Sequence, residues 1–385
     1  MNVKVVGNQH GNSNFNGNQN CGHLLSFLQA PLRIQAPERC PTRRLIVLLF
    51  LLTFFFSCQP EPCTTQLAFY HWKTDAALDS TEQAYLAQLP AQRLYLRLLD
   101  VDWDGHDQAP RPKAEVQVNA LPPVDIIPTV YITNRTLAQL ETSDLDNLSH
   151  RIMMKVEQLL PLDSFVELQI DCDWTEGTRE AYFSLLQHLR ERLPKNTQLS
   201  ATLRLHQYRW PEKTGVPPVD RTMLMFYNMG DLDEWQEPNS ILNLDKATAY
   251  LQHTNTYPLP IDLALPLFRW GVLYRYGKMI KLINGLTPSE ALEAGGVPLD
   301  DAQSRFRIPE STYLQGYYLY TGDELRLEWI TPQQLDQAAQ LLQVFPCSGE
   351  RFLSFYHLDS ILLEAFPVEA LQQVQQVLDQ ETESE

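Results

Sequence analysis

The sequence has few basic residues and lacks a glycine-rich phosphate-binding loop. Its 385 residues include 30 Lys and Arg against 47 Asp and Glu, which gives a formal net charge of −17. An acidic surface repels nucleic acid and anionic lipid headgroups, so no nucleic-acid partner is expected. Because no phosphate loop is present, a nucleotide cofactor is not expected, and we predict no cofactor of any kind.

Cysteine is also scarce, and its placement argues against a disulfide scaffold. The chain has 6 cysteines, of which three lie within or before a predicted export signal. The others are Cys63, Cys172 and Cys347, and their scatter predicts unpaired thiols. A single Cys63–Cys347 bridge is the alternative, since both residues would lie near the chain ends of a closed fold.

The one long apolar run is too short to span a bilayer comfortably. It extends over Leu45–Phe56, follows Arg43-Arg44 and ends at Ser57-Cys58. A basic segment, a short apolar segment and a small residue before the break predict a signal peptide. The Phe-Phe-Ser-Cys end resembles a bacterial lipobox, which implies that the protein is lipidated at Cys58 and anchored to a bacterial membrane in the cell envelope. An uncleaved N-terminal anchor is the alternative.

Beyond this signal, apolar strand-like runs alternate with amphipathic helical segments. Such alternation predicts parallel strands joined by helical crossovers. Eight runs favour a closed α/β barrel of the (β/α)8 TIM type over an open sheet, with a long insertion between strands 7 and 8. The runs cover residues 66–72, 93–102, 125–132, 165–173, 198–204, 222–228, 261–268 and 352–357.

The expected organisation has four parts. An Asn-, Gly- and Gln-rich stretch before the signal is typical of disorder. We therefore expect a disordered leader and signal peptide (1–57), a lipidated tether (58–65), the barrel (66–366, with the insertion at about 269–347), and a C-terminal helix with an acidic tail (367–385).

Polar and aromatic residues collect where the predicted strands end. Barrel active sites are built on that face, and aromatic rings with carboxylates suit sugars. A single polar residue at a strand end is often structural, but recurrence at six or more ends favours a site. The predicted substrate-binding residues among them are Tyr70, Trp72, Asp102, Trp174, Tyr227, Asn228, Trp270 and His357. Other polar residues at strand ends are Asp100, Tyr131, Arg204, Arg269 and Asp359.

Two carboxylates stand out at the end of the fourth run. Asp171 and Asp173 are two residues apart on a strand, so both face the same side. If that side is the barrel interior, one must hold a proton more tightly or a cation must lie nearby. Lys73, Arg204 or Arg269 could supply the cation. A structural ion pair in the barrel mouth is the alternative to a catalytic role.

This segment resembles the fourth strand of glycoside hydrolase family 18, the chitinase type, which reads D-x-x-D-x-D-x-E. Asp171 and Asp173 match the second and third acidic positions, whereas Leu168 and Thr175 occupy the first and last. Glu176 comes one residue after the position of the motif's glutamate, so its side chain would lie on the other face of the strand unless the chain kinks there. The resemblance implies Asp171, Asp173 and Glu176 as the catalytic candidates.

A second motif of that family, M-x-Y-D on the sixth strand, is similar to Met225-Phe-Tyr227-Asn228, with Asn for Asp. In the family a glutamate protonates the leaving oxygen, and the neighbouring aspartate orients the substrate's acetamido group, which attacks. Thr175 cannot donate that proton. The resemblance therefore implies a chitinase-type site without its usual acid.

The chain is also similar, from about Gln66 to Phe366, to bacterial proteins with the domain of unknown function 3142, which implies a glycosidase-related barrel.

The sequence leaves three functions open: a carbohydrate hydrolase whose catalytic groups have shifted, a non-catalytic glycan-binding lipoprotein, and a cell-envelope scaffold or interaction protein. The missing acid favours the second over a chitinase proper, with an oligosaccharide or polysaccharide as partner. No fixed ligand spacing supports a metal site, although His71, Asp102, His206 and His357 would be its candidates.

Overall fold

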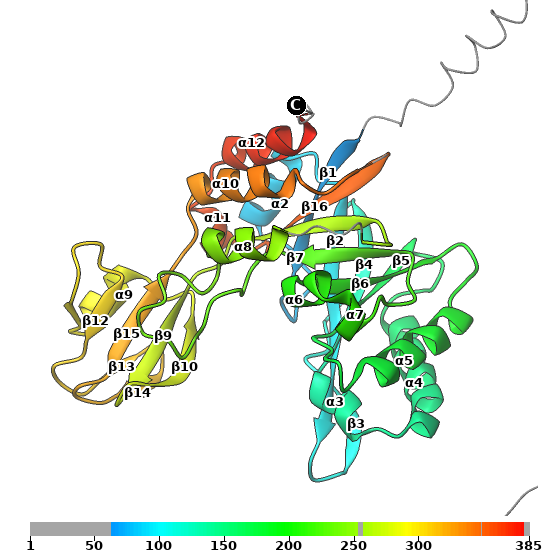
Figure 1. Cartoon of the computed structure of the whole chain (residues 1–385), viewed down its shortest axis with the longest axis horizontal. Coiled ribbons are helices and arrows are strands. Elements are labelled where there is room, and N and C mark those ends of the chain that lie inside the picture. The colour runs from blue at the N-terminus through cyan, green and yellow to red at the C-terminus, as the bar shows by residue number, and fades with distance from the viewer. Residues whose placement is uncertain (1–62, 253–256, 348, 381–385) are drawn as a thin grey trace, which may run out of the picture. The chain divides into compact units, whose positions relative to one another are not determined.

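The computed structural model describes residues 63–252, 257–347 and 349–380. Its central feature is a closed barrel of eight parallel strands (Figure 1). The strands follow the order β1-β16-β8-β7-β6-β5-β4-β2, and pairing of β1 with β2 closes the ring. This confirms the predicted TIM-type barrel. The strands are β1 (Thr64–His71), β2 (Arg93–Asp104), β4 (Asp125–Ile132), β5 (Glu167–Asp171), β6 (Gln198–Arg204), β7 (Arg221–Met225), β8 (Ile261–Pro266) and β16 (Glu350–Tyr356).

The barrel strands form where the sequence has unbroken apolar runs. Every residue of β5 is buried, because a barrel strand is covered by the interior on one face and by helices on the other. All eight predicted runs overlap these strands, and the differences lie at their ends. β2 continues beyond the barrel and forms an antiparallel hairpin with β3 (Ala109–Lys113).

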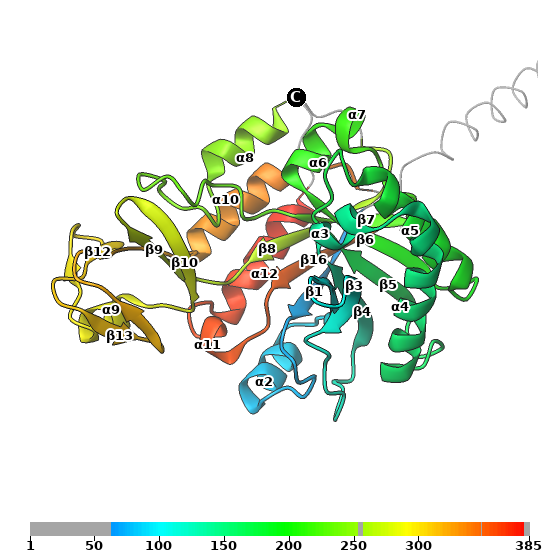
Figure 2. The ribbon, with the colours of Figure 1, turned by 90° about the horizontal axis from the view of Figure 1, so that it is seen from below.

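Amphipathic helices cover the outside of the barrel. α4 (Leu145–Leu159) and α5 (Arg179–Arg192) pack against each other, as Figure 2 shows. In α4 the buried residues Leu148, Ile152 and Val156 recur at helical spacing, which gives the helix one apolar face. The other helices are α2 (Ser80–Gln88), α3 (Asn134–Gln139), the 3-10 turn η1 (Thr142–Asp144), α6 (Leu205–Arg209), α7 (Pro211–Thr214), α8 (Leu244–Leu251), α10 (Pro332–Leu342), α11 (Ser360–Leu363) and α12 (Val368–Asp379).

Ion pairs fill the barrel interior near the N-terminal ends of its strands. Arg93 donates to Glu167 at 2.7 Å, and Arg221 donates to both oxygens of Asp262 at 2.6 Å. The ring of Phe352 lies 3.7 Å from the Arg93 guanidinium and 5.0 Å from that of Arg221. This end of the barrel is therefore closed by its own side chains.

A disulfide joins the start of β1 to the segment before β16. Cys63 and Cys347 are bonded, with 5.4 Å between their Cα atoms and a sequence separation of 284. The prediction of unpaired thiols at these positions was wrong. The physical reason is that β1 and β16 are parallel neighbours with Thr64 opposite Glu350, so the residues just before them meet. Cys172 is free and buried.

The long insertion between β8 and β16 carries a sheet of its own. Five strands follow the order β10-β9-β15-β12-β11, and the hairpin β13–β14 lies apart from them. One face of this sheet forms a small core with Leu273, Phe306 and Leu325. Tyr274 donates its hydroxyl to the carbonyl of Leu232, in the loop between β7 and α8, at 2.5 Å. The elements are β9 (Trp270–Arg275), β10 (Lys278–Asn284), α9 (Pro288–Glu293), β11 (Val297–Pro298), β12 (Arg305–Arg307), β13 (Thr312–Leu314), β14 (Tyr317–Leu319) and β15 (Glu324–Glu328).

Among the described residues, no helix is long and apolar enough to cross a membrane. The predicted signal segment, Leu45–Phe56, and the predicted lipidation site, Cys58, lie outside the described residues.

Candidate functional site

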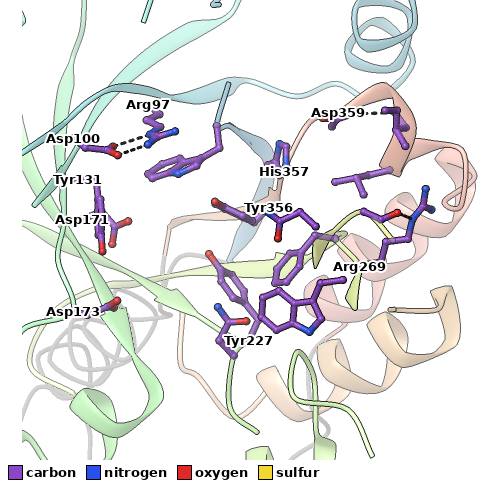
Figure 3. A pocket seen from close by; sticks show the side chains of 18 of the residues that line it. Arg97, Asp100, Tyr131, Asp171, Asp173, Tyr227, Arg269, Tyr356, His357 and Asp359 are labelled. Carbon is purple, nitrogen blue, oxygen red and sulfur yellow. Dashed lines mark hydrogen bonds and ion pairs between the residues drawn. The ribbon is translucent and has the colours of Figure 1, made fainter. Parts of the chain in front are cut away.

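A cavity of about 630 Å³ opens at the C-terminal ends of the barrel strands. Figure 3 shows Asp100, Asp171 and Asp173 on one side of it and Arg269, His357 and Asp359, which follow β8 and β16, on the other. A second cavity of about 300 Å³ shares Asp173, Arg204, Tyr227 and Asn228 with the first and adds His206, Met229 and Tyr250. The main cavity is lined by Trp72, Arg97, Asp100, Tyr131, Asp171, Asp173, Arg204, Tyr227, Asn228, Phe268, Arg269, Trp270, Asn284, Gly285, Tyr356, His357, Asp359, Ile361 and Leu362.

Asp171 and Asp173 both face this cavity from the end of β5. The residue between them, Cys172, is fully buried on the opposite side, as strand alternation requires. Asp171 is buried and accepts a hydrogen bond from the Thr202 hydroxyl at 2.7 Å. The side chain of Asp173 is 44% exposed and accepts hydrogen bonds from Arg204 on both carboxylate oxygens. The strand thus presents one enclosed and one open carboxyl group.

Burial raises the pKa of Asp171 to about 6, and the negative charges of Asp173 and Asp100 act in the same direction. The positive charge of Arg204 and the hydrogen bond from Thr202 oppose this rise. Asp171 can therefore hold or release a proton near neutral pH. Of the three cations predicted for this position, Arg204 is the one that pairs directly with Asp173.

A second carboxylate–guanidinium pair lies on β2. Arg97 donates to Asp100 from Nε at 2.7 Å, and a second bond runs from its terminal nitrogen. The register of β2 against β4 shifts between Arg97 and Leu99. Such a bulge turns the residues that follow it, which explains how both members of a pair three positions apart reach one cavity.

Aromatic rings form the remaining wall. Tyr356 is central, because its ring centroid lies 5.6 Å from that of Trp72, 5.4 Å from that of Tyr227 and 5.8 Å from that of Phe268. Phe268 in turn contacts Trp270, with 5.2 Å between centroids. Contiguous rings of this kind offer a broad apolar surface with polar edges.

Trp270 is held by a buried hydrogen-bond network from the insertion. Its indole nitrogen donates to Glu328 at 2.7 Å, and Glu328 also accepts from Ser240 and from Arg326. Glu328 is 2% exposed and Arg326 1% exposed. The insertion sheet thereby fixes one aromatic ring of the cavity wall, and Asn284 and Gly285 add polar lining from the end of β10.

Two histidines lie at this end of the barrel: His357 lines the cavity, and His71 does not. Burial lowers the pKa of His357 to about 4, and burial with the neighbouring charge of Lys73 lowers that of His71 to about 4. Both rings are therefore neutral at physiological pH. Lys73 bridges Glu82 at 2.5 Å and Asp359 at 3.4 Å, so the positive charge at this rim is already compensated.

The structure brings most of the predicted site residues together. Those that line the cavity are Asp171, Asp173, Trp72, Tyr227, Asn228, Trp270 and His357. Four predicted residues do not line it, namely Tyr70, Asp102, Trp174 and Glu176.

Trp174 and Tyr70 were predicted to contact substrate, but both are 0% exposed. Trp174 follows Asp173 directly, so it points to the helix side, where its ring stacks on Tyr182 at 4.9 Å. Tyr70 faces the barrel interior one layer below the cavity and donates to Gln169 at 2.6 Å. Neither ring can stack on a ligand in this cavity.

Asp102 and Glu176 lie outside the cavity for different reasons. Asp102 belongs to the part of β2 that leaves the barrel, where Arg135 and Thr133 donate to it. Hydrogen bonds from Arg135 lower the pKa of Asp102 to about 2. Glu176 is exposed after the end of β5, as is Thr175, whose backbone nitrogen donates to the Thr178 hydroxyl at 3.0 Å.

Several lining residues were absent from the predicted set. Asp100, Tyr131, Arg204, Arg269 and Asp359 had been noted as polar residues at strand ends, which is the signal that could have included them. Other residues gave no signal: Arg97 depends on the bulge in β2, and Asn284 comes from the insertion. Within the described ranges, no group of three or more His, Cys, Asp or Glu residues is arranged to hold a metal ion.

No protein-family model and no curated protein sequence matches this chain. Among solved structures it is similar to the spore cortex-lytic enzyme SleL of Bacillus cereus, with 14% identity and a TM-score of 0.47 over 80% of this chain and 75% of that chain.

A chitinase from Chromobacterium violaceum is similar at 11% identity and a TM-score of 0.45, over 81% of this chain and 99% of that chain. The Group IV chitinase of Ostrinia furnacalis is similar at 10% identity and a TM-score of 0.47, over 82% and 100%. These likenesses concern the fold and assign no activity or residue role.

Proposed function

We propose that the cavity at the barrel mouth binds an oligosaccharide and that ordinary chitinase-type acid catalysis is absent. The observation that carries this proposal is the lining itself, which combines contiguous aromatic rings with two carboxylate–guanidinium pairs. Rings bury the apolar faces of sugars, and charged groups bind the hydroxyl groups at the edges.

The size of the site favours several linked sugar units. The main cavity of about 630 Å³ is within the usual range for small-molecule sites, and the adjoining cavity of about 300 Å³ extends it past the Asp173–Arg204 pair. A ligand that fills both would contact Tyr227 and Asn228 at the junction.

The position of the acidic groups argues for binding rather than efficient cleavage. In the chitinase-type resemblance the proton donor would occupy position 175, and here Thr175 is exposed and lines neither cavity. Glu176, also a predicted catalytic residue, does not line the cavity. Residual acid–base chemistry would fall to Asp171, which can be protonated near neutral pH, with Asp173 orienting the ligand.

We also propose that the chain is an envelope lipoprotein of the domain of unknown function 3142 type, tethered through Cys58. The disulfide between Cys63 and Cys347 supports export, because such bonds persist in oxidising compartments. Cys63, the first described residue, lies at the N-terminal end of β1, and the cavity opens at the opposite end of the barrel.

A binding and hydrolysis screen on the full-length chain tests this function. Oligosaccharides of N-acetylated and non-acetylated hexoses are titrated by calorimetry, and products are followed by mass spectrometry. The proposal predicts measurable affinity for at least one series with little or no cleavage. Rapid cleavage of chitin oligosaccharides would overturn the proposal that chitinase-type acid catalysis is absent. Absence of binding across the panel would instead favour an envelope scaffold.

A further inference from the structure

The hairpin β13–β14 carries tyrosines on its outer face. Leu314 and Leu319 point into the core of the insertion and are at most 5% exposed. Tyr313, Tyr318 and Tyr320 alternate with them and are 69%, 44% and 51% exposed. Outward positions of such a hairpin are normally polar, so three large rings there have no role in the core.

These rings form one continuous surface. The centroids of Tyr313 and Tyr318 lie 5.0 Å apart, and those of Tyr318 and Tyr320 lie 4.9 Å apart. Both contacts are edge to face, which leaves ring faces and hydroxyl groups accessible along the hairpin. Tyrosine is enriched at binding surfaces because it offers an apolar face and a polar tip at low entropic cost.

Positive charge lies beside this hairpin, on β9 and β10, although the chain as a whole is acidic. The stretch from Arg269 to Ser289 contains four basic residues and no acidic one, whereas the chain has 47 acidic residues. The Lys281 ammonium lies 3.8 Å from the centroid of the Tyr317 ring, which pairs with Leu314 on the inner face of the hairpin and is 37% exposed. Lys278 and Lys281 are exposed and have no ion pair within the described part of the chain. We call Tyr313, Tyr318, Tyr320, Lys278 and Lys281 the tyrosine–lysine surface.

The same strands connect this surface to the cavity. Trp270 begins β9 and Asn284 ends β10, and both line the cavity. Arg275 and Lys278 lie opposite each other at the far end of the β9–β10 hairpin. The Arg275 guanidinium lies 4.1 Å from the centroid of the Tyr320 ring. Trp270 and Arg275 are the two ends of β9, which has six residues, and they lie roughly 17 Å apart.

We propose that the tyrosine–lysine surface is a second binding site for a carboxylate-bearing polysaccharide, and that the same polysaccharide chain continues into the cavity. For the part of the polysaccharide in the cavity, the inference rests on the proposed function. Ring faces would stack on sugar units, and the two lysines would attract their carboxylates. Two linked contacts raise the affinity for a long strand over that for a short one without any change in the cavity.

The test compares two soluble polymers with the same backbone, neutral glycol chitin and anionic carboxymethyl chitin, with a chitin trisaccharide as short ligand. The full-length chain is titrated as wild type, as Tyr313→Ser/Tyr318→Ser and as Lys278→Gln/Lys281→Gln. Tyr313→Phe/Tyr318→Phe retains the rings, and Lys195→Gln removes an exposed charge before β6, so both serve as matched controls. All four positions in the two test variants lie outside the insertion core, so folding should be preserved.

We expect the serine variant to bind both polymers about tenfold more weakly and the trisaccharide unchanged. The lysine variant should lose the preference for the carboxymethyl polymer and the salt dependence of its binding. Both control variants should bind as the wild type does.

Unchanged polymer affinity in both test variants would overturn the inference and leave the cavity proposal intact if the trisaccharide still binds. Polymer binding that depends on the tyrosines, without trisaccharide binding, would support the outer surface and overturn the cavity proposal. A serine variant that binds glycans normally but loses self-association in sedimentation would show a protein contact instead, and would overturn the inference.

Discussion

Arg204 donates hydrogen bonds to both carboxylate oxygens of Asp173, the outer of two acidic residues at the end of β5. The inner one, Asp171, is more deeply buried and accepts from Thr202. Arg204 therefore compensates the outer charge directly and the inner charge only at a distance. Burial raises the pKa of Asp171 to about 6, and the positive charge of Arg204 opposes this rise.

Asp171→Asn should make the protein more stable at alkaline pH. The pKa of Asp171 is raised from 3.8 to about 6, so the native protein holds this proton more tightly than the unfolded chain does. The free energy of unfolding therefore falls as pH rises through that window. Because Asn can still accept from Thr202, the substitution should add about 1–3 kcal/mol at pH 8 and little at pH 4. Urea unfolding at both pH values measures this, and equal destabilisation at both would contradict it.

Reduction of the Cys63–Cys347 bridge should destabilise the barrel. The bond closes a loop with a sequence separation of 284, so its loss restores much conformational freedom to the unfolded chain. We expect the free energy of unfolding to fall by about 2–5 kcal/mol in Cys63→Ser/Cys347→Ser. Cys172→Ala is the control and should stay sensitive to reductant. An unchanged denaturation midpoint, with both thiols shown to be free, would disprove this role.

Much of the fold could be predicted because the eight barrel strands are continuous apolar runs separated by amphipathic helices. Residue alternation also placed Asp171 and Asp173 on one face. The same rule, applied to Trp174, would have placed it on the opposite face with Cys172. The pairing of Cys63 with Cys347 required knowledge that β1 and β16 are neighbours, which depends on closure of the ring.

Other parts of the site had no local signal. Tyr70 has the right parity for the interior, but the sequence does not tell how deep in the barrel it lies. The pairing of Arg97 with Asp100 depends on a register shift in β2. The contribution of Asn284 depends on the tertiary placement of the insertion, which periodicity cannot give.

Glu328→Gln should destabilise the protein and weaken oligosaccharide binding together. The substitution leaves the buried Arg326 without its anionic partner and loosens the hydrogen bond that holds Trp270. We expect a loss of about 3 kcal/mol in the free energy of unfolding. Glu324→Gln, on the same strand, breaks only a surface pair with Arg307 and should cost under about 1 kcal/mol. Equal effects in the two variants, by thermal unfolding and calorimetry, would argue against the positioning role.

Cys58→Ala should release the protein from membranes or leave its precursor unprocessed. The prediction follows from Arg43-Arg44, the apolar run Leu45–Phe56 and the following cysteine. Cell fractionation and mass spectrometry of the mature N-terminus measure it. A mature terminus elsewhere, without an acyl group, would exclude the lipoprotein proposal.

The most direct test of the binding site compares the oligosaccharide affinity of Asp173→Asn with that of Glu176→Gln by isothermal titration calorimetry. Asp173 lines both cavities, whereas Glu176 is exposed outside them. We predict that Asp173→Asn weakens binding about tenfold, because a charged hydrogen-bond acceptor is lost, and that Glu176→Gln binds as the wild type does. Unchanged binding in Asp173→Asn together with a loss in Glu176→Gln would contradict the account and place the site at the outer end of β5.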